Sequence, residues 1–269
     1  MRERMEKRNR KIELFDGHTH LGEIGDPSGA IARAGKIGVF SIVTVGSDYE
    51  SNKRALEISG RYERTVVYAA LGIHPWNLKA EQLENTFRFI EENMGKAVAV
   101  GEIGLDYWIK RARKDPSERE LQKEAFGRLL DLGKKTKKPA IVHCRGAWED
   151  CLDLVMGAQI QKAIFHWFSG PIEVLAKVLG HGYFISATPA AAYSEKHQRA
   201  IARTPLENLL LETDSPVEYE GKAAEPADVC KTLEAVAKIK GAKREEVAEI
   251  TTRNALVFFD LESRHPIGK

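Results

Sequence analysis

The sequence predicts an α/β fold, a single (β/α)8 TIM barrel, from three observations. Short apolar runs of strand length alternate with amphipathic stretches of helix length, and this alternation implies parallel strands joined by crossover helices. Eight such runs occur in 269 residues, and a closed barrel typically needs roughly 250 residues. No Gly-rich phosphate loop follows the first run, which disfavours the alternative, an open doubly wound sheet.

The eight strands and the helices between them are expected at regular intervals. The strands are residues 12–16, 37–45, 65–71, 97–101, 139–143, 163–166, 183–186 and 208–212. The helices are residues 50–59, 80–92, 117–135, 148–156, 171–179, 194–203, 226–239 and 243–259. Asp48 is a suitable cap for the first helix, and Pro116 stands at the start of the third.

Composition indicates one globular domain. No linker or composition break divides the chain, so residues 12–262 are expected to form the barrel, behind a basic, solvated N-terminal arm at residues 1–11. Hydrophobic residues make up 43% and charged residues 30% of the chain, as in a soluble protein with a packed core. The net charge of +2 excludes a protein that wraps long nucleic acid, so any nucleic-acid contact is expected to be local.

The cysteines and the apolar runs bear on the cellular compartment. Cys144, Cys151 and Cys230 show no paired spacing, so neither a disulfide framework nor a thiolate metal site is expected, and a reducing cytoplasm fits best. No signal-peptide core is present and no stretch approaches the roughly 20 apolar residues of a membrane span, so no membrane partner is expected. The oligomeric state is left open.

Residues able to bind a metal stand at or just past the ends of six of the predicted strands. They are His18 and His20, His74, Glu102, His143, His166 and Asp214. Taken singly, each has an ordinary structural explanation: a buried His is usually a satisfied core residue, and a buried Glu is often one half of an ion pair. The ends of barrel strands meet at one mouth, where barrel enzymes place their active sites. Together these residues therefore predict a metal site.

The number of ligands predicts two ions. His18 and His20 are two residues apart, so both can lie on one side of a strand and bind one cation. Four histidines and two carboxylates exceed the three protein ligands of a single catalytic zinc, and they suit two divalent ions with Glu102 between them. Ligands of this kind permit Zn²⁺, Mn²⁺, Mg²⁺ or Ni²⁺.

The order of the motifs resembles the TatD family of metal-dependent hydrolases, in the amidohydrolase superfamily. The stretches are Gly17-His-Thr-His-Leu21, Gly72-Ile-His-Pro75, Gly101-Glu-Ile-Gly-Leu-Asp-Tyr107, Val142-His-Cys-Arg145, His166-Trp-Phe-Ser-Gly170 and Leu211-Glu-Thr-Asp-Ser-Pro216. The resemblance runs from about residue 12 to about residue 260. It implies a TIM barrel with a divalent-metal centre and a deoxyribonuclease, typically a 3′–5′ exonuclease that acts on single-stranded DNA ends.

The resemblance also assigns roles to individual residues. It gives one ion to His18, His20 and Asp214 and the other to His143 and His166, with Glu102 between them. Asp214 is expected to orient the attacking water or accept its proton, so Asp214 and Glu102 count as catalytic. His74 is expected to contact the substrate phosphate or to protonate the departing oxygen.

Substrate contacts are expected at Arg145 and Tyr107, although Arg145 is as readily explained by a salt bridge that balances the carboxylates. Residues 108–114 form either a solvated basic loop or a track for a nucleic-acid backbone, with Tyr107 or Trp108 stacking on a base. The chain departs from the family at Gly22, where many members carry Asp, and before Pro226, where Asn is usual. These departures bear on the choice of substrate end rather than on metal binding.

Two other functions stay open at this point. The same site would hydrolyse a carboxyl ester or an amide, including removal of a D-amino acid from tRNA, an activity with which TatD-like proteins have been linked. The substrate is therefore expected to be a DNA end, with RNA or tRNA as the alternative. A non-catalytic barrel that serves as a binding platform is disfavoured by the complete ligand set.

Overall fold

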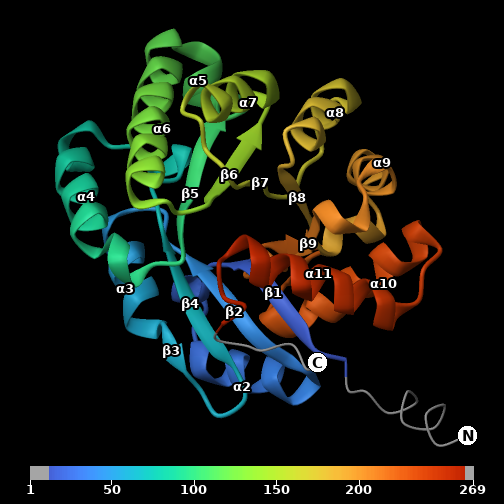
Figure 1. Cartoon of the computed structure of the whole chain (residues 1–269). Coiled ribbons are helices and arrows are strands. Elements are labelled where there is room, and N and C mark those ends of the chain that lie inside the picture. Colours follow the sequence, from blue (N-terminus) through green and yellow to red (C-terminus); the bar gives the residue numbers. More distant parts are fainter. Residues whose placement is uncertain (1–11, 264–269) are drawn as a thin grey trace, which may run out of the picture.

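The structure is a computed structural model that describes residues 12–263, so the predicted arm at residues 1–11 lies outside the described residues. Parallel strands form a central sheet in the order β1-β2-β4-β5-β6-β7-β8-β9, with the helices around it (Figure 1). The strands are β1 (Leu14–Thr19), β2 (Val39–Val45), β4 (Val66–Leu71), β5 (Ala99–Asp106), β6 (Ala140–Arg145), β7 (Ala163–Phe165), β8 (Phe184–Ala187) and β9 (Leu209–Leu211).

The first and last strands meet just beyond β9. The amide of Asp214 donates to the carbonyl of His18 (2.9 Å), and the amide of His20 donates to the carbonyl of Ser215 (2.7 Å). Thr19 and Ser215 form a parallel bridge between them. The eight predicted strands are therefore present and the predicted TIM barrel is confirmed.

Two strands that extend further than predicted carry candidate metal ligands in the extension. The fourth predicted strand, residues 97–101, is β5, which continues to Asp106, so Glu102 lies inside a strand rather than at its end. Gly104 makes this possible: its φ of +145° is open to glycine, and a Cβ there would come within 2.0 Å of the carbonyl oxygen of His143. Similarly, β1 continues beyond residue 16 and includes His18.

The predicted helices are all present. They are α3 (Tyr49–Ile58), α4 (Ala80–Asn93), α6 (Pro116–Thr136), α7 (Trp148–Gly157), α8 (Ile172–Gly180), α9 (Glu195–Arg203), α10 (Val229–Lys240) and α11 (Arg244–Phe258). The prediction missed α2 (Pro27–Ile37), whose two glycines hide its apolar periodicity, although Asp26 caps the amide of Gly29 (2.9 Å). It also missed α5 (Lys110–Lys114), which lies in the segment predicted as a basic loop.

Short elements complete the fold. They are β3 (Gly60–Arg61), the hairpin β10 (Glu218–Tyr219) and β11 (Lys222–Ala223), and the 3-10 turns η1 (Leu21–Glu23), η2 (Pro75–Asn77), η3 (Met94–Lys96), η4 (Pro189–Ala192), η5 (Leu206–Asn208) and η6 (Pro226–Asp228). Several of these turns directly follow strands, so they line the end of the barrel that carries the predicted site. Among the described helices, none combines the length and apolar character that crossing a bilayer requires.

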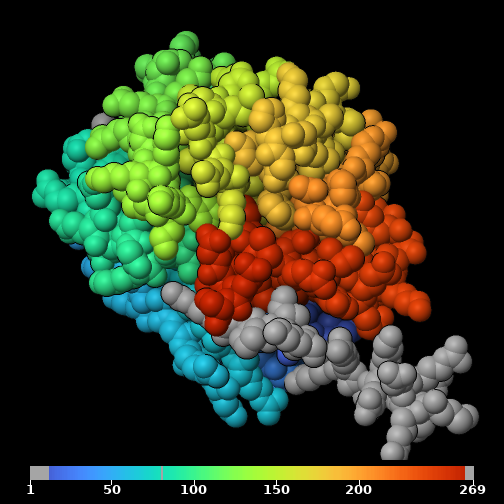
Figure 2. Space-filling view, in the orientation of Figure 1, coloured from blue at the N-terminus to red at the C-terminus, as the bar shows by residue number. Residues whose placement is uncertain are grey.

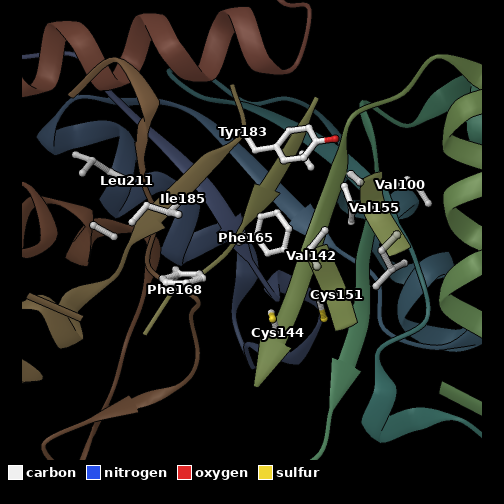
Figure 3. Packing of buried hydrophobic residues seen from close by; sticks show 14 of the residues in the cluster. Val100, Val142, Cys144, Cys151, Val155, Phe165, Phe168, Tyr183, Ile185 and Leu211 are labelled. Atoms are coloured by element: carbon white, nitrogen blue, oxygen red, sulfur yellow. The ribbon is translucent and has the colours of Figure 1, made fainter. Parts of the chain in front are cut away.

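Apolar side chains pack both faces of the sheet. One cluster lies between strands and helices and includes Val142, Phe165 and Ile185 (Figure 3). A second joins strand residues to the end of α11, where the ring of Phe15 stacks on that of Phe259 with 5.7 Å between centroids. In the space-filling view the last part of the chain (red) lies against its earlier segments (Figure 2). This dense packing fixes the side chains at the strand ends.

A buried histidine, His197 on α9, ties together the segments that follow two strands. Its Nδ1 donates to the carbonyl of Phe168 (2.8 Å), and its Nε2 accepts from the amide of Thr188 (3.2 Å). These two bonds require the neutral imidazole, because a backbone amide only donates and a carbonyl only accepts. Burial lowers the pKa of His197 from 6.5 to about 4, which keeps the ring neutral.

We expect His197 to make the fold sensitive to mild acid. Its pKa is lower in the folded chain than in the unfolded chain, so the unfolded chain binds more protons as pH falls from 6.5 towards 4. The free energy of unfolding should fall through this window, with up to about 3 kcal/mol due to His197. Urea unfolding of the wild type and of His197→Asn at about pH 7 and about pH 5 measures this. If His197→Asn loses as much unfolding free energy as the wild type between these pH values, His197 is not the group responsible.

Candidate metal centre

The two carboxylate oxygens of Glu102 face two different sets of histidine nitrogens. Oε2 lies 3.3 Å from Nε2 of His18 and 3.3 Å from Nε2 of His20. Oε1 lies 2.8 Å from Nε2 of His166, 2.9 Å from Nδ1 of His143 and 3.3 Å from Nε2 of His74. Glu102 is only 2% exposed. A buried carboxylate with one oxygen in each of two ligand sets has the arrangement of a bridging ligand.

The first ligand set comes from the two ends of the sheet. The Nε2 atoms of His18 and His20 are 3.4 Å apart, and each lies 3.5 Å from Oδ1 of Asp214. The Nδ1 atoms of both histidines are buried with no hydrogen-bond partner among residues 12–263. The two Nε2 atoms and the carboxylate oxygen of Asp214 lie close enough together to bind one divalent cation.

The backbone around Asp214 places its carboxylate. Asp214 has a φ of +51°, in the left-handed region that Asp and Asn tolerate better than most residues. The preceding residue is fixed by the buried Asp16, which accepts hydrogen bonds from the amide (2.9 Å) and the hydroxyl (2.7 Å) of Thr213. Burial raises the pKa of Asp16 well above its usual value, although the bonds from Thr213 act against this. Asp16 thus positions Asp214, a role that its sequence context did not indicate.

The second ligand set has outer carboxylates. Nδ1 of His143 and Nε2 of His166 lie 3.3 Å apart on the inner side. On the outer side, Nε2 of His143 lies 3.2 Å from Oδ2 of Asp106, and Nδ1 of His166 lies 3.3 Å from Oε1 of Glu212. Both carboxylates are essentially buried. A carboxylate behind a ligating histidine fixes its orientation and raises its basicity.

Asp106 and Glu212 were missed as site residues, although both lie in the quoted motifs. Asp106 stands four residues after Glu102 on the same strand, so the two-residue period of a strand would place both on one side once β5 is known to continue. Glu212 lies two residues before Asp214, directly after β9. The signal was therefore present, but it depended on where the strands end.

The outer carboxylate Glu212 gives a testable effect on metal affinity. Glu212→Gln keeps the shape of the side chain but removes the charge behind His166, so metal affinity should fall roughly 10- to 100-fold. Competition with a fluorescent chelator measures this change. Glu207→Gln, on an exposed residue of η5, is the matched control and should bind metal like the wild type. Equal affinity in the two variants would contradict the role of Glu212.

The carboxylates of the site raise the pKa values of neighbouring histidines, so these histidines hold protons when no cation is present. Burial by itself lowers the pKa of His20, but its contacts with Asp214 and Glu102 raise it to about 10. Burial also lowers the pKa of His166, whereas Glu102 and Glu212 raise it well above its usual value. Burial raises the pKa of Glu102, but the surrounding histidines hold it well below its usual value. A divalent ion would replace these protons, so metal binding should release them.

His74 differs from the other histidines of the site. Burial lowers its pKa to about 4, and the attraction of Glu102 only partly offsets this. Its Nδ1 accepts a hydrogen bond from the amide of Trp76 (3.1 Å). The neutral ring therefore carries its proton on Nε2, which faces the centre of the site.

The predicted substrate residues occupy different positions. The side chain of Arg145 is 40% exposed, and its Nε donates to Oδ2 of Asp106 (2.8 Å), so the salt bridge expected as one explanation is present. The hydroxyl of Tyr107 donates to Asp150 on α7 (2.7 Å), and the guanidinium of Arg119 lies over its ring. These contacts engage Tyr107 with the surrounding helices, and its part in substrate binding stays a prediction.

The two departures from the family pattern lie on turns. Gly22, in η1, packs closely on Arg54 of α3, where a Cβ would come within 2.9 Å of its Cγ. Glu225 occupies the position before Pro226 and forms an ion pair with Arg33 of α2 (2.8 Å). A side chain at position 22 would therefore displace Arg54, whereas a change at position 225 would remove the ion pair with Arg33.

Several known proteins are similar to this chain over nearly its whole length. The family model described as TatD related DNase matches residues 15–260. A metal-dependent hydrolase of Methanocaldococcus jannaschii, MJ1582, is 32% identical, over 93% of this chain and 98% of its own. Human deoxyribonuclease TATDN3 is 29% identical, over 96% and 98%. The crystal structure of the TatD homologue YjjV of Escherichia coli superposes with a TM-score of 0.83 at 26% identity, over 93% of this chain and 99% of that one.

Proposed function

Because the chain belongs to the TatD family of metal-dependent hydrolases, we propose that it is a deoxyribonuclease that removes nucleotides from the 3′ ends of single-stranded DNA. The observation that carries the proposal is the position of Glu102, whose two oxygens face two separate ligand sets. Paired divalent ions are a recurrent solution for phosphodiester cleavage, because they stabilise both the attacking and the departing oxygen. The TATDN3 relatives named as deoxyribonucleases support DNA as the substrate.

The donor set fits two divalent ions. His18, His20 and Asp214 would hold one ion, His143 and His166 the other, and Glu102 both. Histidine nitrogens mixed with carboxylate oxygens match the preferences of Zn²⁺, Mn²⁺ and Ni²⁺, and the carboxylates also suit Mg²⁺. When bound, such ions lower the pKa of water and withdraw charge from the phosphate.

The side chains then divide the acid and base roles. Asp214 holds its Oδ1 between His18 and His20, where it can orient the attacking water and accept its proton. His74 presents a protonated Nε2 towards the centre and can donate to the phosphate or the departing oxygen. Because burial lowers the pKa of His74 and keeps the ring neutral, its Nε2–H can donate a hydrogen bond to an oxygen of the substrate without adding a charge to the site.

Product analysis of a single-stranded oligonucleotide tests the proposal. The protein is stripped of metal and then loaded with Mn²⁺, Mg²⁺ or Zn²⁺ separately. A 5′-labelled strand should give a metal-dependent ladder of stepwise-shortened products, whereas a 3′-labelled strand should release its label at the first cut. An intact strand with every metal, from protein shown to bind two ions, would overturn the proposal and favour ester or amide substrates such as a D-aminoacyl-tRNA.

A further inference from the structure

Exposed aromatic side chains surround the end of the barrel that carries the site. Within residues 12–263 the large exposed aromatics are Trp76 (49% exposed), Trp108 (44%) and Tyr193 (47%). They follow β4, β5 and β8, so all three lie beyond the carboxyl ends of strands. The indole of Trp76 also contacts the site itself, with its ring centroid 5.0 Å from that of His74 and 6.2 Å from that of His143.

Trp76 is held rigidly although half of its surface is open to water. Its Nε1 donates to Oδ2 of Asp106 (2.6 Å), and the guanidinium of Arg145 lies 5.0 Å from its ring centroid. Arg111 donates to the carbonyls of Pro75 (2.8 Å) and Trp76 (3.0 Å) and so ties α5 to η2. A large aromatic ring fixed beside a catalytic centre with an open surface is typical of a platform on which a base stacks.

Unpaired cations stand next to this ring. An open hollow is lined by Trp76, Ile109, Lys110, Arg111 and Lys114. Lys110 and Lys114 are exposed and form no ion pair with any residue that the structure describes, whereas Arg111 pairs with Glu118 (3.0 Å). Free ammonium groups beside an exposed aromatic ring form the combination that binds a flexible, negatively charged strand.

We propose that Trp76 stacks on a base of a single-stranded nucleic acid whose phosphate enters the metal centre, and that Lys110 and Lys114 contact the neighbouring phosphates. This inference rests on the proposed nuclease function and names its substrate contacts. Trp76 takes the stacking role that the sequence suggested for Tyr107 or Trp108. The indole of Trp108 instead packs edge-on against Trp148, 5.5 Å between centroids.

The stacking is tested by removing a base from the nucleic acid and, separately, the indole ring from the protein. The substrate is a single-stranded oligonucleotide with phosphorothioate terminal linkages, and its affinity for the metal-loaded protein is measured by fluorescence anisotropy. Trp76→Ala should weaken binding of the intact strand about tenfold. The base that meets Trp76 is found by moving an abasic site through the terminal nucleotides. For the strand that lacks this base, Trp76→Ala should weaken binding by less than about twofold. Trp76→Phe should keep most of the affinity, and the matched control Trp108→Ala should bind like the wild type.

The salt dependence of binding tests the two lysines. Lys110→Ala and Lys114→Ala should each reduce the slope of log affinity against log salt by about 0.7, the value for one phosphate contact on a single strand. Lys238→Ala is the matched control, since Lys238 is an exposed residue in the last turn of α10. An unchanged slope in the first two variants would contradict the phosphate contacts.

Failure of this inference differs from failure of the proposed function. If the wild type shortens the strand but Trp76→Ala weakens intact and abasic strands equally, Trp76 is no stacking platform and the nuclease function stands. The same conclusion follows if Trp76→Phe loses as much affinity as Trp76→Ala. If the wild type with two ions bound neither binds nor cleaves any strand, both proposals are overturned.

Discussion

Replacing Glu102 with glutamine is expected to lower the rate of phosphodiester hydrolysis on the order of a thousandfold, the largest effect of any conservative change in this protein. The substitution keeps the shape of the side chain but turns one of its two oxygens into an amide nitrogen. An amide nitrogen does not coordinate a divalent cation, so one of the two ligand sets loses the oxygen that Glu102 supplies to it. The bound metal should fall from about two ions per chain to about one or fewer.

Metal content by mass spectrometry and turnover of bis(p-nitrophenyl) phosphate measure these effects separately. Glu92→Gln is the matched control, because it makes the same chemical change on an exposed residue of α4. Circular dichroism of both variants separates loss of the site from loss of the fold. Near-wild-type turnover of Glu102→Gln with metal present would remove Glu102 from the centre.

Asp214→Asn should give the second largest effect, a loss of at least roughly a hundredfold in kcat. The amide can neither accept the proton of the attacking water nor supply a charge between His18 and His20. Asn tolerates the left-handed backbone at this position, where φ is +51°, so the loop should keep its conformation. The loss therefore reports on the carboxylate rather than on the backbone.

Asp260→Asn provides a matched control for this variant. Asp260 is another aspartate in the left-handed region (φ +56°), and it is exposed and pairs with Lys162 at the surface. Its substitution should leave kcat unchanged. If Asp214→Asn and Glu102→Gln both kept near-wild-type turnover with metal present, the assignment of the catalytic centre would be wrong.

Local pattern predicted the barrel and the six candidate metal ligands, His18, His20, Glu102, His143, His166 and Asp214, because both predictions depend on short segments. His18 and His20 share one apolar run, and each of the other four follows or ends a run of its own, as Asp214 follows the run that forms β9. The alternation of strands and helices then predicts that these ends meet. The parallel bridge between Thr19 and Ser215 confirms that the first and last segments are neighbours.

The remaining residues of the site depend on contacts between distant segments. Asp106 becomes the partner of His143 only because Gly104 lets β5 continue beside β6. Trp76 is fixed by Asp106, thirty residues later in the chain, so the local sequence does not show where its ring lies. The same holds for Tyr107, whose side chain pairs with Asp150 on α7. Sequence periodicity predicts which face a residue occupies, but not which distant side chain meets it there.

The position of metal ions relative to Glu102 is the most direct test of a binuclear centre. Anomalous diffraction from crystals of the Mn²⁺-loaded protein locates the ions without assuming an activity. A binuclear centre should give two peaks about 3.5–4 Å apart, one near each carboxylate oxygen of Glu102, with His18, His20 and Asp214 around one peak. A single peak, or two peaks of which neither lies beside Glu102, would contradict it.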